Sequence, residues 1–264
     1  MTRILAIANE KGGVAKTTTA ISLGGVLVKR GQDVLLIDLD PQANLTLALG
    51  ISPHEVRQST ADLLLHSQPP IGISRETIIQ GLDIIPSNSE MGLAERFLPI
   101  RQDYKKILQQ ALSPVQMYDT IILDCPPSLG VITQNALAAA DFLIVPTQVE
   151  YFSVYSLRNV MSLIKSIREN DNPKLTYRIL ITMLDIRIGS HNTLEKQLRS
   201  TFKNAVFNTA IQIDSKLRES GIAGLPITHY SPRSRSVEQY KALAMELPQY
   251  VSTEKVAQPA GRSI

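Results

Sequence analysis

A pair of glycines set between two lysines, close to the start of the 264-residue chain, has the residue types of a phosphate-binding loop. Residues 11–18 read Lys-Gly-Gly-Val-Ala-Lys-Thr-Thr and follow the apolar run 3–9. Gly12 and Gly13 let the backbone turn tightly, so that successive N–H groups can approach phosphate oxygens with no side chain in between. A helix that begins near Lys16 would point the positive end of its dipole at the same anion. The segment therefore predicts a site for nucleotide phosphates.

Each side chain of the loop can make a different contact with a bound phosphate chain. Lys16 can reach the β and γ phosphates, the hydroxyl of Thr17 is placed to ligate a magnesium ion, and Thr18 can bond a neighbouring phosphate oxygen. The residue before Lys16 is Ala15, where the general pattern has glycine, so the loop is a variant. Lys11 lies on the far side of the glycine pair and is poorly placed to share the task of Lys16 within one subunit. We expect Lys11 to reach a different nucleotide.

Three aspartates follow apolar runs and are candidates for metal and water chemistry. Asp38 and Asp40 end the run that starts at residue 34, and ligands of open parallel sheets bind beyond the carboxyl ends of the strands. Asp124 ends the run 118–124, as does the aspartate by which a phosphate-loop enzyme holds magnesium through a water. A single aspartate in such a place can simply cap a loop. Three of them, each after a buried strand and behind a phosphate loop, favour a metal site at Thr17, Asp38 and Asp124.

The elements that must position these groups alternate between strands and helices. Strand-like apolar runs occupy residues 4–8, 34–37, 82–85, 120–123, 142–145, 178–182 and 205–208, with helical periodicity between most of them. Residues 149–170 predict one long helix, and residues 51–81 predict an excursion of short helices and loops. Buried strands flanked by helices indicate an α/β fold with a doubly wound, mostly parallel sheet.

Length and composition favour one large domain. A chain of 264 residues with 44% hydrophobic content can fill one α/β core and is somewhat short for two full domains. We expect one domain at 1–251 and a disordered tail at 252–264, where Pro, Gly, Ser and isolated charges mix. Apolar runs stay far below the roughly 20 residues that cross a bilayer. The single cysteine, Cys125, can form neither an internal disulfide nor a metal cluster within one subunit, which favours a reducing, cytosolic compartment.

Charge is distributed unevenly along the chain. Residues 1–173 carry 14 basic and 17 acidic side chains, whereas residues 174–264 carry 13 basic and 7 acidic ones, so the C-terminal third has a net charge of +6. Scattered basic residues are often only a solvated surface. The alternative is a surface that binds nucleic acid, and the sequence leaves both interpretations open.

Three segments taken together resemble the ParA/MinD group of deviant Walker A ATPases. They are Lys11–Thr18, the run Asp-Leu-Asp-Pro-Gln at 38–42 and the run Asp-Cys-Pro-Pro at 124–127, and the likeness to small ParA/Soj-type partition proteins extends from residue 3 to about 250. The resemblance implies a P-loop ATPase that binds ATP and Mg²⁺ and pairs into an ATP-sandwich homodimer. The phosphate contacts would come from Gly12, Gly13, Val14, Ala15, Lys16, Thr17 and Thr18.

The same resemblance assigns the catalytic groups. Lys11 of each subunit would contact the nucleotide held by the other, beside Lys16 of the holding subunit. Asp40 would position the attacking water, and Asp38 would support the magnesium and phosphate-loop network. Residues 125–130 would form the second switch, with two prolines stiffening the turn.

Other family positions map onto the C-terminal half. Met183 would lie near adenine, although a place in the core is the alternative, and Ile211 and Gln212 would line the adenine pocket. On the DNA-facing surface the family places basic residues at Arg187 and at Lys216, where an ammonium replaces the usual guanidinium. Arg233 and Arg235, in the loop before the last long helix, would contact the phosphate backbone or remain solvated.

The function implied by the resemblance is an ATP-dependent switch that positions or segregates a cargo. It would bind non-specific DNA in its ATP state, on the nucleoid, and hydrolyse ATP slowly until a ParB-like or cargo-adaptor protein stimulates it. The cargo would be a plasmid, a chromosome or a protein compartment. A MinD-like membrane ATPase and a metabolic ATP-dependent enzyme are the alternatives. Residues 252–264 contain only two large apolar residues, which disfavours a membrane-targeting helix, and a single cysteine excludes an electron-transfer ATPase whose subunits share a cluster.

Overall fold

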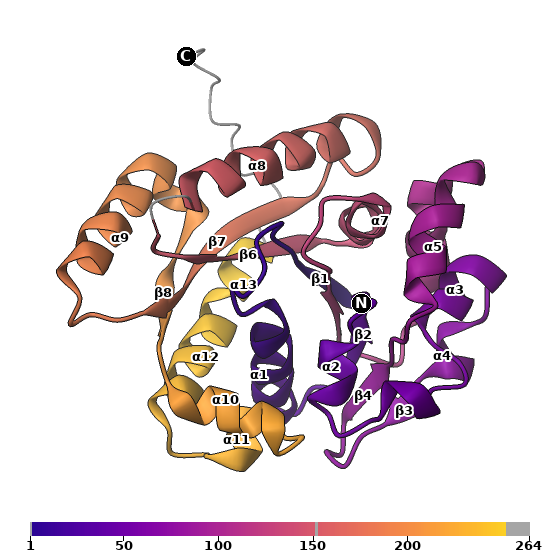
Figure 1. Cartoon of the computed structure of the whole chain (residues 1–264), viewed down its shortest axis with the longest axis horizontal. Coiled ribbons are helices and arrows are strands. Elements are labelled where there is room, and N and C mark those ends of the chain that lie inside the picture. Colours follow the sequence, from indigo (N-terminus) through magenta and orange to yellow (C-terminus); the bar gives the residue numbers. More distant parts are fainter. Residues whose placement is uncertain (1, 151–152, 252–264) are drawn as a thin grey trace.

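One twisted eight-stranded sheet forms the middle of the molecule (Figure 1). The computed structural model describes residues 2–150 and 153–251. In spatial order the strands are β3 (Arg75–Glu76), β4 (Leu82–Ile85), β2 (Val34–Asp38), β5 (Thr120–Asp124), β1 (Arg3–Ile7), β6 (Phe142–Gln148), β7 (Thr176–Leu184) and β8 (Val206–Gln212). All neighbours pair in parallel except β3 and β4. The predicted mostly parallel α/β sheet is confirmed.

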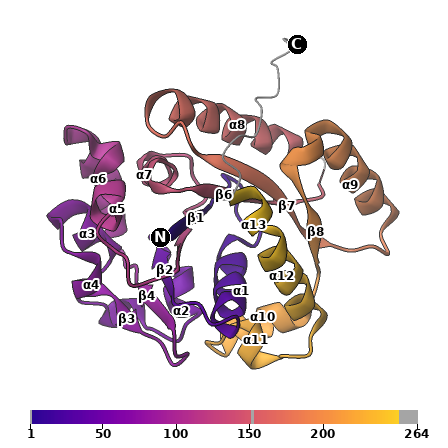
Figure 2. The same cartoon turned by 180° about the vertical axis from the view of Figure 1, so that it is seen from behind.

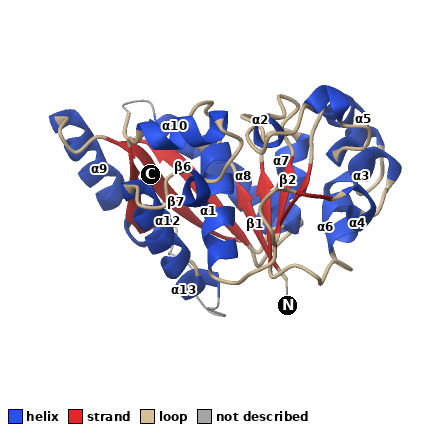
Figure 3. Ribbon diagram, turned by 90° about the horizontal axis from the view of Figure 1, so that it is seen from below, coloured by secondary structure: helices blue, strands red, loops and turns tan. Residues whose placement is uncertain are grey.

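Helices cover both faces of the sheet, as Figures 2 and 3 show from behind and from below. One face carries α1 (Lys16–Lys29), α10 (Ser215–Ile222), α11 (Ile227–Tyr230), α12 (Arg235–Glu246) and α13 (Pro248–Val251). The other carries α3 (Thr60–His66), α5 (Met91–Phe97), α6 (Ile107–Leu112), α7 (Val131–Ala139) and α8 (Ser153–Asn170). The shorter α2 (Asn44–Leu47) and α4 (Pro70–Ile73), the outlying α9 (Gly189–Phe202), and the 3-10 turns Pro53–Glu55, Leu98–Ile100, Tyr104–Lys106 and Lys203–Ala205 complete the elements.

Alternation along the strands builds two cores. In β2, Leu35 and Ile37 join the cluster under α3 to α8, whereas Val34 and Leu36 join the cluster under α1 and α12. All five residues of β2 are buried, because side chains on both faces meet a helix layer. This explains why the strands are nearly continuous apolar runs in the sequence.

Each predicted strand is present, and the differences lie at the ends. The run predicted at 142–145 continues to Gln148, and the one predicted at 205–208 continues to Gln212, because parallel pairing extends past the last apolar side chains. The two-residue β3 escaped prediction because it is too short for a periodic signal. The long helix predicted at 149–170 begins at Ser153 among the described residues. The excursion at 51–81 contains the predicted short helices and loops, together with a 3-10 turn and β3. The tail predicted at 252–264 lies outside the described residues.

The phosphate-loop helix α1 is fixed from the far end of the chain. A Cβ added at Gly25 would lie 2.6 Å from the Cβ of Pro226 and 2.6 Å from Oγ1 of Thr228, so only glycine allows α1 and the start of α11 to approach this closely. The hydroxyl groups of Thr19 in α1 and the fully buried Tyr240 in α12 are 3.3 Å apart. The C-terminal helices therefore set the position of the nucleotide-binding end of α1.

A glutamate side chain accepts hydrogen bonds from the exposed edge of the outer strand β8. The backbone N–H groups of Asn208 and Thr209 donate to the two carboxylate oxygens of Glu246 in α12, at 2.7 and 3.0 Å. Glu246 is buried and also accepts from the hydroxyl of Tyr250 at 3.0 Å. These bonds occupy two edge groups that would otherwise be open to another strand.

Every helix in the described part of the chain is too short or too polar to span a bilayer.

Candidate active site at the carboxyl end of the sheet

The loop between β1 and α1 has the backbone of a phosphate cradle. Gly13 has φ +74° and Ala15 φ +66°, both in the left-handed region. For Ala15 that conformation costs roughly 1–2 kcal/mol, and α1 begins at the next residue. The loop borders a cavity of about 470 Å³, whose wall includes Gly12, Gly13, Ala15, Lys16, Thr17 and Thr18. The predicted phosphate contacts are thus at the cavity, except for Val14, which is buried behind the loop.

Lys16 is held across the mouth of the loop. Its Nζ donates to the carbonyl oxygen of Lys11 at 3.1 Å, and the residue is only 7% exposed. Burial lowers the pKa of Lys16, an effect opposed by the nearby carboxylate of Asp124. When a nucleotide binds, the ammonium group of Lys16 can release the carbonyl oxygen of Lys11 and donate to phosphate oxygens instead.

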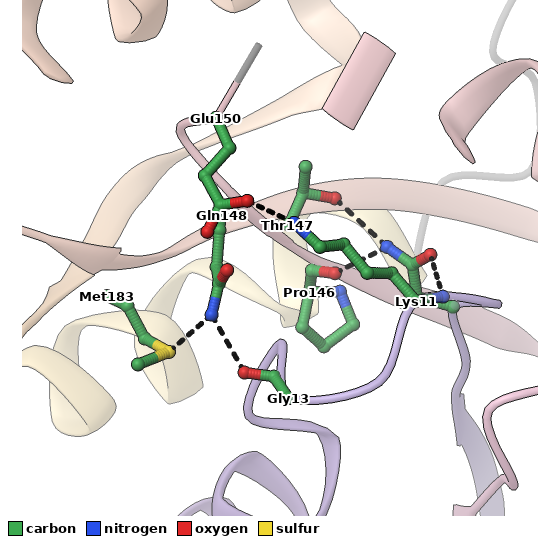
Figure 4. A network of polar contacts seen from close by, with 8 residues as sticks. Lys11, Gly13, Pro146, Thr147, Gln148, Glu150 and Met183 are labelled. Atoms are coloured by element: carbon green, nitrogen blue, oxygen red, sulfur yellow. Dashed lines mark hydrogen bonds and ion pairs between the residues drawn. The ribbon is translucent and has the colours of Figure 1, made fainter. Parts of the chain in front are cut away.

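Lys11 points away from the cavity that Lys16 serves. Figure 4 shows its side chain running along β6, where Nζ forms an ion pair with Glu150 at the surface. Its backbone N–H donates to Oδ1 of Asn9, and Nδ2 of Asn9 donates to the carbonyl of Pro146 at 2.8 Å. The head of the loop is therefore tied to β6, and Lys11 does not line the cavity of its own subunit.

Gln148, at the end of β6, connects the loop to the next strand. Its Nε2 donates to the carbonyl oxygen of Gly13 at 2.8 Å and also contacts the sulfur of Met183, as Figure 4 shows. Met183 lines the cavity and has φ +53°. Of the two roles that the sequence left open for Met183, the cavity wall is where the structure places it.

Asp38 and Asp40 lie at different depths. Asp38 is fully buried: Oδ1 accepts from the N–H of Asp40 at 3.1 Å, and Oδ2 accepts from the N–H and hydroxyl of Thr46 at 2.9 and 2.7 Å. Burial raises the pKa of Asp38 to about 6 despite these bonds. Asp40 lines the cavity, and its Oδ1 accepts from the N–H of Gln42 at 2.9 Å. Asp38 thus braces the start of α2, whereas Asp40 faces the ligand space.

Asp124 and Thr17 form the candidate magnesium site. The hydroxyl of Thr17 donates to Oδ2 of Asp124 at 2.7 Å, whereas Oδ1 is buried and takes no hydrogen bond within the described chain. Burial raises the pKa of Asp124 well above its usual range, and Asp38, its register partner on β2, adds like-charge repulsion. A buried carboxylate oxygen without a donor, beside a hydroxyl, fits a magnesium ion or its water. Because no group of three or more His, Cys, Asp or Glu side chains in the described chain could hold a metal by itself, phosphate oxygens and water would complete the ion's shell.

The far end of the cavity is built by the last residues of β8. Ile211 and Gln212, predicted to line an adenine pocket, are both in its wall, and the N–H of Gln212 donates to Oε1 of Gln239 at 3.0 Å. The sequence reasoning missed further wall residues, namely Gln42, Asn44, Pro127, Ile213, Asp214, Leu217, Arg218 and Tyr240. The signal available for most of them was position, since they follow the carboxyl ends of β2, β5 and β8.

The predicted DNA-binding residues lie near one another at the same end of the sheet. The loops after β7 and β8 are joined by a bond from the N–H of Ile213 to the carbonyl of Leu184, and Nη2 of Arg235 donates to the carbonyl of Ile213 at 2.6 Å. Arg187 is paired with Asp185, which holds the pKa of that carboxyl at about 2.

Two further basic residues complete this surface. Lys216 is paired with Glu219 at 2.8 Å. Arg233 is exposed in the loop before α12. Part of the positive charge on this surface is therefore offset locally.

Comparisons with known proteins agree with this geometry. A family model described as an AAA domain matches residues 2–177. The chain is 39% identical over 249 residues to the sporulation initiation inhibitor protein Soj of Bacillus subtilis, covering 94% of this chain and 98% of that protein. It is 37% identical to the chromosome partitioning protein ParA of Caulobacter vibrioides, covering 93% of each.

A solved structure of cobyrinic acid a,c-diamide synthase from Mycobacterium smegmatis with a bound ATP analog and magnesium superimposes with a TM-score of 0.84. Its identity to this chain is 32%, and the match covers 97% of this chain and 98% of that one. A nucleotide with magnesium is thus bound by a relative with the same fold.

Proposed function

The chain belongs to the ParA/Soj family of P-loop ATPases, which use ATP and magnesium, and on that basis we propose that it is a dimerising switch that positions or segregates a cargo. In its ATP state it would form an ATP-sandwich homodimer and bind DNA without sequence preference. A ParB-like or cargo-adaptor protein would stimulate hydrolysis and reset the switch. Such a protein would work in the cytoplasm, on the nucleoid.

The position of Lys11 is the observation that carries the proposal. A second lysine at the head of a phosphate loop has no task in its own cavity, since its side chain runs outside and pairs with Glu150 on the surface. That ion pair is partly exposed and is therefore worth only about 0–1 kcal/mol. A phosphate chain presented by a second subunit, with several negative charges, would compete well for the ammonium group.

Within one subunit the described residues suit phosphoryl transfer to water. Lys16 and the N-terminus of α1 would bind the β and γ phosphates, and Thr17 and Asp124 would hold the magnesium ion, which neutralises phosphate charge when bound. Asp40 would orient the attacking water from the cavity wall. Asp38 would act through Thr46 and Asp40, because both of its oxygens already accept hydrogen bonds.

Sequence-independent DNA binding would follow from pairing. Arg187 lies in the loop after β7, Lys216 in the first turn of α10 and Arg235 at the start of α12, and a dimer presents the set twice. Affinity for a phosphate backbone depends steeply on the number of contacts through counterion release, so a dimer can bind where a monomer does not. Because Asp185 and Glu219 partly neutralise this surface, we expect a single subunit to bind DNA weakly.

The test combines light scattering with a mobility shift. The parent chain should become dimeric with ATP and Mg²⁺ and should then shift duplexes of unrelated sequence at low salt, but not with ADP. Lys11→Ala should bind ATP and remain monomeric, without shifting DNA. Lys165→Ala, which removes an exposed lysine on α8 paired with Glu169, is the matched control and should behave as the parent. ATP-dependent dimerisation of Lys11→Ala would refute the proposed contact between Lys11 and the nucleotide of the other subunit.

The likeness to cobyrinic acid a,c-diamide synthase favours one second candidate, an ATP-dependent synthase acting on a small carboxylic acid. Such an enzyme would turn over ATP in proportion to a small acceptor and would ignore DNA. ATPase rates measured with duplex DNA and, separately, with cobyrinic acid distinguish the two functions.

A further inference from the structure

One cavity residue has a charge that neither the phosphate loop nor the expected DNA surface accounts for. Arg218 lies in the wall of the nucleotide cavity, on α10. Among the wall residues that the structure describes, Lys16 and Arg218 are the only cationic ones. A triphosphate carries several negative charges, so a second cation in its cavity alters the binding energy directly.

The guanidinium of Arg218 also lacks the partners that hold the neighbouring basic side chains. Lys216 is paired with Glu219, Arg187 with Asp185, and Arg235 donates to the carbonyl of Ile213. Within residues 2–150 and 153–251, no hydrogen bond or ion pair holds the side chain of Arg218. Five N–H donors in a fixed fork are therefore available to a ligand.

Helix α10 is held at both ends, so the backbone that carries Arg218 is fixed. At its start, Asp214 caps the helix by accepting from the N–H of Lys216 at 3.0 Å, and its other oxygen accepts from the hydroxyl of Ser236 at 2.7 Å. At its end, a Cβ at Gly221 would lie 4.0 Å from the Cβ of Ala48. Just beyond it, a Cβ at Gly224 would lie 3.3 Å from the backbone of Gly50.

These contacts indicate on which side of the cavity Arg218 lies. The end of α10 abuts the segment that follows α2, and Arg218 is about one turn before that contact. Asn44, about one turn before the same contact on α2, lines the cavity together with Asp40 and Gln42. Arg218 therefore belongs to the side of the cavity where Asp40 lies, which is where the terminal phosphate is expected.

We propose that Arg218 is an additional ligand for the terminal phosphate of ATP, supplied by the same subunit that holds the nucleotide. The guanidinium would favour ATP over ADP, because it contacts the group in which the two nucleotides differ. It would also link the nucleotide to α10, the helix that carries Lys216 on the expected DNA surface. The inference rests on ATP binding at the proposed site and does not require dimerisation or DNA binding.

The experiment measures the dissociation constants of ATP and ADP, both with Mg²⁺, for the parent chain, Arg218→Ala, Arg218→Lys and Lys241→Ala. A hydrogen bond to a charged group strengthens binding, and the exposure of Arg218 limits that gain. We expect Arg218→Ala to weaken ATP binding about five- to tenfold and ADP binding less than twofold, with Arg218→Lys in between. Lys241→Ala, which removes an exposed lysine on α12 paired with Glu238 and outside the cavity wall, should bind both nucleotides as the parent does.

Two further measurements test the assignment of Arg218 to the terminal phosphate. The ATP affinity of Arg218→Ala should vary less steeply with salt concentration than that of the parent, because one cationic contact is lost, and its thermal midpoint without nucleotide should match the parent's. Unchanged ATP affinity, or equal losses for ATP and ADP, would overturn the assignment to the terminal phosphate. A parent chain that binds ATP but never DNA would refute the proposed function and leave this inference standing.

Discussion

At the scale of single residues, Asp124 combines its proposed magnesium-binding role with a cost to the fold. Its Oδ1 is buried without a hydrogen-bond donor among the described residues, and Asp38 lies opposite it in the strand register. A carboxylate in this position is unfavourable until a cation arrives. In its proposed role, Asp124 therefore favours magnesium binding at the expense of the stability of the free protein.

A pH-dependent prediction follows for Asp124→Asn. Burial holds the pKa of Asp124 above its value in the unfolded chain, so the carboxyl contributes its stability below the unfolded pKa and loses it as pH rises through the folded pKa. Asparagine cannot ionise. Without magnesium, Asp124→Asn should melt a few degrees Celsius above the parent at pH 8, the shift expected for about 1 kcal/mol in a chain of this size, and this difference should shrink as the pH falls toward the unfolded pKa of aspartate, about 4.

Thermal melts with EDTA check this, and melts with Mg²⁺ and ATP serve as the control. There the order should reverse, because the variant loses the ligand that the ion needs. A variant that melts below the parent at pH 8 with EDTA would show that the hydrogen bond from Thr17 outweighs the cost of the charge.

At the scale of elements, the meeting of α1 with the start of α11 depends on one missing methyl group. Gly25→Ala would place its Cβ 2.6 Å from atoms of Pro226 and Thr228, and overpacking of this kind costs about 1–3 kcal/mol. We expect a loss of that size in the free energy of unfolding from denaturant titration, together with weaker ATP binding as α1 shifts.

Gly92→Ala is the matched control for that experiment. Gly92 is also inside a helix, α5, and a Cβ there would meet no atom within 4 Å. This variant should gain about 0.4–1 kcal/mol, since alanine restricts the unfolded chain. Equal effects of the two substitutions would mean that helix propensity, and not the contact with α11, decides.

Elements with a local signal could be predicted from the sequence, and those that depend on distant contacts could not. The phosphate loop, the start of α1 at Lys16 and the aspartates after β2 and β5 follow from short patterns of glycine, lysine and apolar runs. The contact from Gln148 to Gly13 joins residues 135 positions apart, and no pattern marks it.

Arg218 escaped prediction for a similar physical reason. In the sequence it looks like any exposed arginine of an amphipathic helix. Its place in the cavity wall becomes visible only when α10 is seen to end against the segment after α2.

At the scale of the whole molecule, the exposed edge at β8 limits which assemblies the chain can form. Glu246→Ala would leave the N–H groups of Asn208 and Thr209 without their acceptors. A hydrogen bond to a charged group contributes about 1.5–3 kcal/mol, and less where the groups are partly exposed, and open edge groups favour pairing with another chain. We expect a lower thermal midpoint and turbidity at temperatures where the parent stays clear.

Glu238→Ala tests the specificity of that result, since Glu238 is on the same helix and forms an exposed ion pair with Lys241. It should melt and scatter light as the parent does. Aggregation of both variants alike would point to the loss of negative charge and not to the opened edge.

The order of strands in the sheet also has a consequence for biosynthesis. Strand β1 leaves the ribosome before its two neighbours, β5 and β6, which start at Thr120 and Phe142. The phosphate loop that follows β1 therefore stays without a framework until both of these strands have been translated, and the helix behind it waits for Pro226 and Tyr240. Nucleotide capture thus requires the C-terminal helices, and a nascent chain that ends before them will not sequester ATP.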